Sequence, residues 1–207
     1  MSVSVEILNV SEAAKYRNFL SAEERARSAS IVQETAKARF ELGRGLRRRM
    51  LAEAKGVDPD ELLFAEDLNG KPCVANPAGW DFNLSHAGEY VAVVVGGGCV
   101  GVDIEMVRPV REAGSIVKRY FHPDEAMAWH TVAPGLREEA FFVLWSAREA
   151  SMKCAGLGLA RGLSVTRVDP AILADRQAAA RVGDTRMDIR RLDAPNGYVA
   201  VVAETAR

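Results

Sequence analysis

Residues 82–105, FNLSHAGEYVAVVVGGGCVGVDIE, are the most apolar stretch of the chain and decide the fold that we expect. Runs rich in valine and other strand-forming residues span 81–84, 90–95 and 99–104. Tight glycine-containing turns separate these runs, so the stretch predicts three successive strands. The last strand ends in two carboxylates, Asp103 and Glu105.

Helical patterns flank this stretch on both sides. Ser21 and Glu24 form a capping-box signature that opens a helix through about residue 31. A longer helix is expected from residue 33 to 55, with Gly56 as its stop. Further helices are expected at 111–120, 123–131 and 137–155, and further strands at 3–9 and near 163–168, 186–192 and 197–203.

The composition excludes several classes of protein. The 207 residues carry 27 Lys and Arg against 28 Asp and Glu, a net charge of -1, which argues against a general nucleic-acid binder. Three cysteines without a C-x-x-C spacing indicate neither a disulfide framework nor a zinc site, and they fit a reducing cytoplasm. We expect neither a secretory signal nor a membrane span, which would need roughly 20 apolar residues.

The charges are nevertheless segregated along the chain. Residues 1–55 hold 11 basic and 7 acidic residues, whereas residues 56–125 hold 5 basic and 12 acidic residues. Such a pattern is expected where a basic stretch meets anions and an acidic stretch meets cations. Solvated faces can produce the same pattern by chance.

The two carboxylates at the end of the apolar strand are the first candidate site. Side chains two apart in a strand share a face, so Asp103 and Glu105 project together and repel each other. A divalent cation that bridges them would remove this repulsion. The alternative is a strand that has simply reached the surface, with both acids solvated.

The second candidate lies in the segment WSAREASMK, residues 145–153. Each helical residue turns by about 100°, so Trp145, Glu149 and Lys153 fall along one side of the helix. Taken alone, Glu149 and Lys153 are an ordinary surface ion pair. Trp145 and Met152 beside them indicate instead that this side is partly buried.

The third candidate is the segment Asn83-Leu84-Ser85-His86, between one expected strand and the next, in which we expect His86 to lie in a polar turn beside Ser85. A hydroxyl, an imidazole and free backbone N–H groups there would suit a phosphate, although a lone histidine in a loop is often merely solvated. Adjacent extended residues point apart, so Ser85 and His86 are poor candidates for a nucleophile and its base.

The fourth candidate is the basic helix. Arg44 and Arg48 share a face away from the stripe of Leu42 and Leu46, with Arg39 ahead of them, and their forked donors suit phosphate. The alternative is a solubilising face, above all for residues 47–49.

Taken in order, these pieces resemble the surfactin-type 4′-phosphopantetheinyl transferases. The resemblance runs from about residue 39 to 164 through ARFELGRGLRRRML, NGKP, FNLSHAGEYVAV, VGVDIE, RYFHPDE and WSAREASMK. It implies an α+β fold of two similar halves, related by a pseudo-two-fold axis, each a small antiparallel sheet packed with helices. It places residues 1–106 in an N-terminal half for coenzyme A and residues 107–207 in a C-terminal half with the metal-binding helix and the carrier-protein side.

The resemblance also implies the reaction, in which the phosphopantetheine arm of coenzyme A moves to a serine of an apo acyl or peptidyl carrier protein. It implies Mg²⁺ or Mn²⁺ bound by Asp103, Glu105 and Glu149, and a catalytic set of Glu149, Lys153 and Asp103. Phosphate and adenine contacts are implied for Arg39, Arg44, Lys71, Pro72, Ser85, His86 and Lys153.

Some points stay open at the level of sequence. Arg148 stands where the family usually has lysine, and Arg25 or Arg27 are further candidates for phosphate contacts. A monomer is expected, while the carrier protein, its docking surface and the pathway are not readable. Two alternatives remain, a metal-dependent phosphohydrolase that acts on a nucleotide pyrophosphate and a non-catalytic module that binds a carrier protein or a nucleotide.

Overall fold

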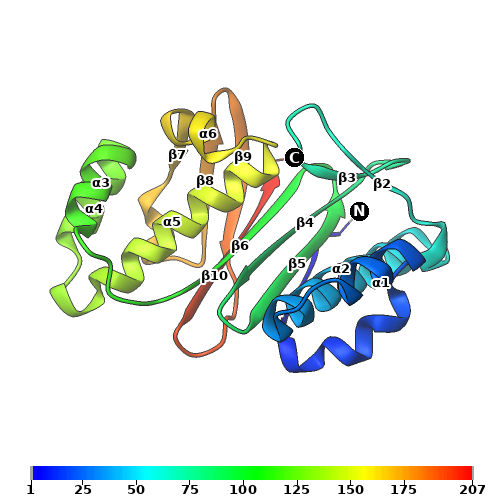
Figure 1. Cartoon of the computed structure of the whole chain (residues 1–207). Helices are drawn as coiled ribbons and strands as arrows, with labels where there is room; N and C mark the ends of the chain where they lie inside the picture. Colours follow the sequence, from blue (N-terminus) through cyan, green and yellow to red (C-terminus); the bar gives the residue numbers. More distant parts are fainter. Residues whose placement is uncertain (1, 207) are drawn as a thin grey trace. The chain divides into compact units, whose positions relative to one another are not determined.

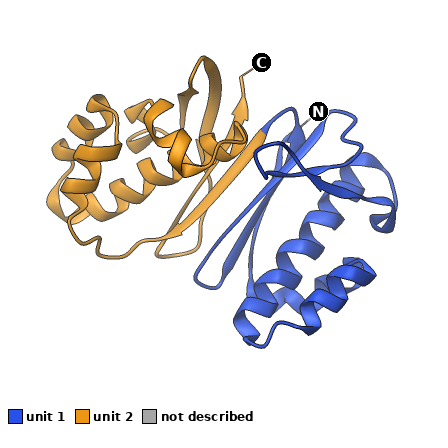
Figure 2. Cartoon of the chain, turned by 45° about the horizontal axis from the view of Figure 1, so that its top comes forward, with its two compact units in different colours: residues 1–99 blue, residues 100–207 orange. Residues whose placement is uncertain are grey.

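The computed structural model describes residues 2–206, and the chain divides into two compact units, Met1–Cys99 and Val100–Arg207 (Figure 2). The sequence predicted a division after residue 106. Strand β6 (Val100–Met106) pairs along its whole length with β10 (Tyr198–Thr205), so it belongs to unit 2 and the division precedes it.

Unit 1 contains an antiparallel sheet in the order β1-β5-β4 and a separate two-stranded sheet, β2-β3 (Figure 1). Its elements are β1 (Ser4–Asn9), a 3₁₀ helix (Val10–Phe19), α1 (Ala22–Ala29), α2 (Glu34–Lys55), a 3₁₀ turn (Pro59–Glu61), β2 (Phe64–Glu66), β3 (Pro72–Val74), β4 (Trp80–Ala87) and β5 (Tyr90–Gly97).

Helix α2 provides much of the core of unit 1. Leu42, Leu46 and Met50 recur every four residues on one face and pack with Val91 and Val93 of β5. The helix ends at Gly56, whose φ of 66° is easily adopted only by a residue without Cβ. The α1 helix begins with the expected capping box between Ser21 and Glu24.

Unit 2 contains an antiparallel sheet in the order β6-β10-β9-β8-β7, with helix α5 packed along β6 and β10 (Figure 1). Its further elements are α3 (Ala113–Tyr120), α4 (Pro123–Thr131), a 3₁₀ turn (Pro134–Leu136), α5 (Arg137–Cys154), α6 (Leu159–Val165), β7 (Thr166–Val168), a 3₁₀ turn (Pro170–Leu173), β8 (Gln177–Val182) and β9 (Thr185–Arg191).

The α+β prediction is confirmed, because each unit combines antiparallel strands with helices. The expected long helices are present, but β2, β3 and β8 were not predicted. Residues 163–165 end a helix rather than begin a strand. None of the helices within residues 2–206 combines the length and apolar composition that crossing a membrane requires.

The prediction that His86 lies in a turn is wrong. Strand β4 continues through Ala87, and His86 is paired with Val91 of β5. The turn consists only of Gly88, with φ 51°, and Glu89. The polar composition of the segment suggested a longer loop than this tight hairpin needs.

Candidate active site

Strand β6 places two acidic side chains on the same face, as its sequence predicted. Val102 and Ile104 alternate with them and are fully buried in the core. Asp103 is only 2% exposed, so the alternative of a solvated strand end is wrong for this residue. Glu105 is half-buried and forms an ion pair with Arg108 at 3.3 Å.

Helix α5 brings Glu149 and Lys153 to this face of β6. The Lys153 ammonium lies 2.6 Å from Asp103 Oδ1 and 3.6 Å from Glu149 Oε2. The Trp145 side chain donates a hydrogen bond to Glu149 from one turn earlier in the helix. The indole itself stacks on Phe141 with ring centroids 6.1 Å apart. The partly buried helix side inferred from the sequence is therefore present.

The close approach of α5 to β6 depends on Gly101. A Cβ at this position would lie 2.1 Å from the Ala150 carbonyl oxygen and 2.5 Å from the Cys154 backbone nitrogen. Both distances are far below van der Waals contact, so only glycine fits. Gly101 was not predicted as a site residue, although a glycine inside an apolar strand often marks a close backbone approach.

The electrostatics of the cluster confirm that the carboxylates interact. Burial raises the pKa of Glu105, and the negative charge of Asp103 raises it further against the lowering effect of Arg108. Burial likewise raises the pKa of Glu149, with Asp103 adding to the shift and Lys153 opposing it. Negative charge is thus concentrated at one place on unit 2.

The donor set suits a hard divalent cation. Carboxylate oxygens are the ligands that Mg²⁺ prefers, and a cation there would relieve the repulsion that adds to the effect of burial on these two pKa values. The Lys153 ammonium already lies between Asp103 and Glu149 as a positive charge. Within residues 2–206, however, no three His, Cys, Asp or Glu side chains stand close enough together to form a metal-binding group.

In unit 1, the structure brings together three of the side chains predicted to contact phosphate. Arg39, Arg44 and His86 line a pocket of roughly 360 Å³ between α2 and β4, with Gly43 on its wall. Arg39 Nε donates a hydrogen bond of 3.0 Å to the Gly88 carbonyl, which fixes the guanidinium against the β4–β5 turn.

The remaining predicted residues of unit 1 lie elsewhere. Ser85 is buried and does not line this pocket, since neighbouring side chains in a strand point to opposite faces. Lys71 forms an ion pair of 2.5 Å with Asp81. Pro72 lines a second pocket of roughly 750 Å³, and Arg44 lines both pockets.

The alternative of a solubilising face at residues 47–49 is wrong for two of them. Arg47 and Arg48 are 1% and 5% exposed and bind the two carboxylate oxygens of Glu24 at 2.8 and 2.6 Å. Their α1 partner was not predicted, because 23 and 24 residues separate it from them. Arg27 lines the 750 Å³ pocket, and Arg25 binds the Leu20 carbonyl.

Arg148 points away from the carboxylate cluster. Its Nη1 donates to both oxygens of Glu125 in α4, at 2.9 and 2.8 Å, and to the Thr166 carbonyl at 3.0 Å. The guanidinium also binds the Leu163 carbonyl. With 1% of the residue exposed, Arg148 joins α5 to α4 and α6 inside unit 2.

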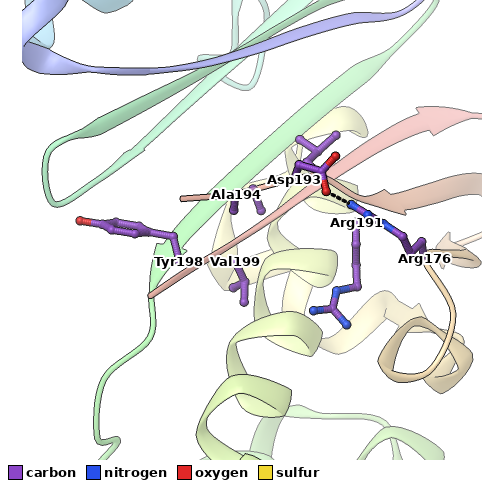
Figure 3. Close-up of a pocket in the computed structure, with 8 residues that line it drawn as sticks. Arg176, Arg191, Asp193, Ala194, Tyr198 and Val199 are labelled. Carbon is purple, nitrogen blue, oxygen red and sulfur yellow. Dashed lines mark hydrogen bonds and ion pairs between the residues drawn. The ribbon is translucent and has the colours of Figure 1, made fainter. Parts of the chain in front are cut away.

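Unit 2 has a pocket of roughly 340 Å³ beside β9 and β10 (Figure 3). Arg176 reaches across it to Asp193 at 2.7 Å, and Arg191 pairs with Glu139 at 3.0 Å. None of the site residues predicted from the sequence lines this pocket.

Two family models match the chain. A model of the 4′-phosphopantetheinyl transferase superfamily matches residues 99–203, and a model of the N-terminal part of 4′-phosphopantetheinyl transferases matches residues 9–96. The two matches fall in unit 2 and unit 1 respectively, so each unit corresponds to one part of the family.

Curated relatives give the same result. The 4′-phosphopantetheinyl transferase psf-1 of Bacillus pumilus is 35% identical over 167 residues, which cover 80% of this chain and 70% of that protein. HetI of Nostoc sp. is 31% identical over 162 residues, 74% of this chain and 68% of that protein. Sfp of Bacillus subtilis is 28% identical over 152 residues, 73% and 67% of the two chains. The chain therefore belongs to the 4′-phosphopantetheinyl transferase family.

Proposed function

We propose that this transferase moves the 4′-phosphopantetheine arm of coenzyme A to a serine of an apo acyl or peptidyl carrier protein. The reaction would need Mg²⁺ or Mn²⁺ and would release adenosine 3′,5′-bisphosphate. The observation that supports this most directly is the cluster of Asp103, Glu149 and Lys153, in which a buried acid, a partly buried acid and one ammonium meet where α5 packs on β6.

The carboxylates of unit 2 are proposed to hold the cation and to move one proton. Asp103, Glu105 and Glu149 would hold Mg²⁺, which when bound would supply positive charge to the pyrophosphate. Glu149 would accept the proton of the carrier serine, directly or through water. Its carboxylate is held for this role by Trp145 and Lys153.

The bonds in the proposed step balance. The serine oxygen attacks the β-phosphorus of coenzyme A, a new P–O ester bond forms, and the P–O bond to adenosine 3′,5′-bisphosphate breaks. The serine proton goes to Glu149. Lys153, whose Nζ lies 2.6 Å from Asp103 and 3.6 Å from Glu149, would donate hydrogen bonds to the phosphate oxygens of the substrate.

Unit 1 is proposed to bind the nucleotide end of the same substrate. Arg39, Arg44 and His86 line one pocket and would bind phosphate there. Lys71 and Pro72 would line the adenine site. The side chains of unit 1 are cationic and would bind phosphate directly. The carboxylates of unit 2 are anionic and would hold a metal cation for the same phosphorylated ligand.

Glu149→Gln tests the proposal. The amide keeps the shape but cannot accept the serine proton, so we expect transfer to fall by at least about 100-fold while coenzyme A binding remains measurable. The assay is the intact mass of a panel of apo carrier proteins incubated with coenzyme A and Mg²⁺. Glu138→Gln, an exposed acid on the same helix, is the matched control and should turn over normally.

Two results would count against the proposal. Normal transfer by Glu149→Gln would remove Glu149 from its role. Cleavage of coenzyme A without any carrier would indicate a phosphohydrolase instead. The carrier that is modified fastest would identify the pathway served. We also propose that the protein acts as a monomer in the cytoplasm, which sedimentation and fractionation would test.

A further inference from the structure

Two adjacent arginines of α2 are buried inside unit 1. Arg47 and Arg48 share the carboxylate of Glu24, which also accepts a backbone hydrogen bond of 3.0 Å from Ser21. Two guanidinium groups therefore face one carboxylate, and the excess positive charge lies inside the protein. Burial, followed by the charge of Arg44, lowers the pKa of Arg47 to about 9. Burying a charged guanidinium is energetically unfavourable, so other contacts are needed to stabilise Arg47 in this position.

The contacts of Arg47 differ from those of its neighbour. Its Nε and Nη1 have no hydrogen-bond partner within residues 2–206. The guanidinium carbon instead lies 3.5 Å from the ring centroid of Phe64 and 5.0 Å from that of Phe82. The two rings meet edge to face with centroids 5.4 Å apart. Besides its ion pair with Glu24, Arg47 thus contacts two aromatic rings at cation–π distance.

Phe64 is the first residue of β2, so the contact between Arg47 and Phe64 joins α2 to the β2–β3 hairpin. Within the described chain, β2 and β3 pair as strands only with each other and not with the β1-β5-β4 sheet. The hairpin therefore depends on side chains to hold it in place. Arg48 fixes the segment before it by donating to the carbonyls of Pro59 and Leu62 at 2.8 and 3.0 Å.

The same hairpin carries the Gly70-Lys71-Pro72 turn. Pro72 pairs with Glu66 across the hairpin and lines the 750 Å³ pocket together with Arg44, Arg47 and Phe64. Exposed carboxylates, among them Asp60 and Glu66, lie on the rim of this pocket. A shift of Phe64 would displace this wall.

We propose that Arg47 is a positioning residue for coenzyme A, because its guanidinium stacks on Phe64 and fixes the β2–β3 hairpin that presents Lys71 and Pro72. The inference rests on the proposed function. Arg47 acts through Phe64 and the hairpin and does not touch the reacting atoms. Lysine cannot replace it, since an ammonium has the charge but not the planar face.

The test compares Arg47→Met, Arg47→Lys and Phe64→Leu with the wild type. We expect each to raise the Kd and KM for coenzyme A by about tenfold or more, because small displacements of a binding wall are costly. The kcat at saturating coenzyme A should stay within about twofold. In Arg47→Met combined with Phe64→Leu, the loss of coenzyme A affinity should be smaller than the sum of the two single losses, since the two variants share the Arg47–Phe64 contact.

Arg49→Met is the matched control. Arg49 lies on the same helix, and its ion-pair partners, Glu6 and Glu53, lie outside the hairpin. Its Kd for coenzyme A should equal that of the wild type. Amide hydrogen exchange in the protein without coenzyme A gives a second readout. Exchange across residues 64–74 should accelerate in the Arg47 variants and stay unchanged in Arg49→Met.

The possible failures are distinguishable. A wild-type protein that neither binds coenzyme A nor loads a carrier contradicts the proposed function. A wild type that loads a carrier, together with Arg47 variants of normal Kd and normal exchange in the hairpin, overturns the inference alone. Lower thermal stability with an unchanged Kd would also overturn it, because Arg47 would then serve only the core. If Arg47→Met does not fold, Arg47→Lys and Phe64→Leu decide the question.

Discussion

The ion pair between Arg148 and Glu125 shows how one side chain can take a direction that its sequence neighbours do not reveal. Arg148 is adjacent to Glu149, yet the two residues point to different surroundings. Glu125 is fully buried, and burial raises the pKa of Glu125 although Arg148 opposes the shift. The pair is stable only because both members are also bound by backbone groups, such as the Val168 N–H that donates to Glu125 at 2.7 Å.

Arg148→Met should therefore destabilise the protein strongly. The change leaves the Glu125 carboxylate buried without its cation, which costs about 3–5 kcal/mol in comparable cases. Urea unfolding followed by circular dichroism measures the free energy of unfolding. In the double variant with Glu125→Met, the loss should be smaller than the sum of the two single losses. Additive losses would show that the two groups do not depend on each other.

At the residue scale, the direction of a side chain could be predicted from the sequence where the helical repeat alone determines it. Trp145, Glu149 and Lys153 were placed on one side of a helix by the rotation per residue, and their contacts confirm it. The inward direction of Arg148 could not be predicted, because its partner is 23 residues earlier in another helix. The burial of Arg47 was missed for the same reason, since a run of arginines in a helix is typical of an exposed face.

Gly101 sets the distance between two elements, β6 and α5. An added Cβ would overlap the backbone of α5 at both Ala150 and Cys154, and backbone atoms cannot move aside as a flexible side chain can. The helix would have to shift outward, and with it Glu149 and Lys153 would move from Asp103. This single position therefore links the packing of unit 2 with its chemistry.

Gly101→Ala should lower stability and transfer together. Overpacking of this kind typically costs about 1–3 kcal/mol, and we expect the loss of transfer to exceed what the unfolded fraction explains. Gly135→Ala is the matched control, because a Cβ there meets nothing within 4 Å. Thermal melting and the carrier-mass assay should be run on both. A fully active Gly101→Ala would show that the helix tolerates the displacement.

Helices and strands with long hydrophobic patterns are present in the structure as the sequence predicted. The valine-rich β5 and the leucine stripe of α2 are present as predicted. The short strands β2, β3 and β8 were missed because three-residue strands carry little pattern, and β8 (QAAARV) contains mainly alanine, which has low strand propensity. In β4, His86 stands in a regular strand position despite its polar neighbours, because pairing with β5 determines the local structure.

At the scale of the whole molecule, the stability of unit 1 should decline in acid. Burial would raise the pKa of Glu24 and of Glu41, but both values are lowered from 4.5 by their hydrogen bonds and by nearby arginines. Glu41 accepts from Ser28 at 2.6 Å and from Arg17 at 2.7 Å. A carboxyl with a depressed folded-state pKa stabilises the fold above its unfolded pKa and loses this effect as the pH falls.

Glu41→Gln tests this decline. At pH 7 we expect the variant to be less stable than the wild type by about 1–3 kcal/mol, because hydrogen bonds to a charged group are lost. Between pH 5 and pH 3, its free energy of unfolding should fall less steeply, because one linked proton is removed. Urea unfolding at several pH values gives both quantities. Parallel profiles for the two proteins would contradict the assignment.

The division into units was only partly foreseeable from the sequence. The family resemblance suggested two halves, but β6 joined unit 2 because of its pairing with β10, whose first residue is more than 90 positions away. The net charge of -1 is near neutral, but the charged residues are unevenly distributed along the chain. Basic residues line the pockets of unit 1, while acids gather on β6 and α5 of unit 2.

The placement of Lys153 between Asp103 and Glu149 also affects the protein without bound substrate. The chain carries its own counterion for the acids on which its chemistry is proposed to depend. Unit 2 can thus complete its folding with this charge already compensated from within.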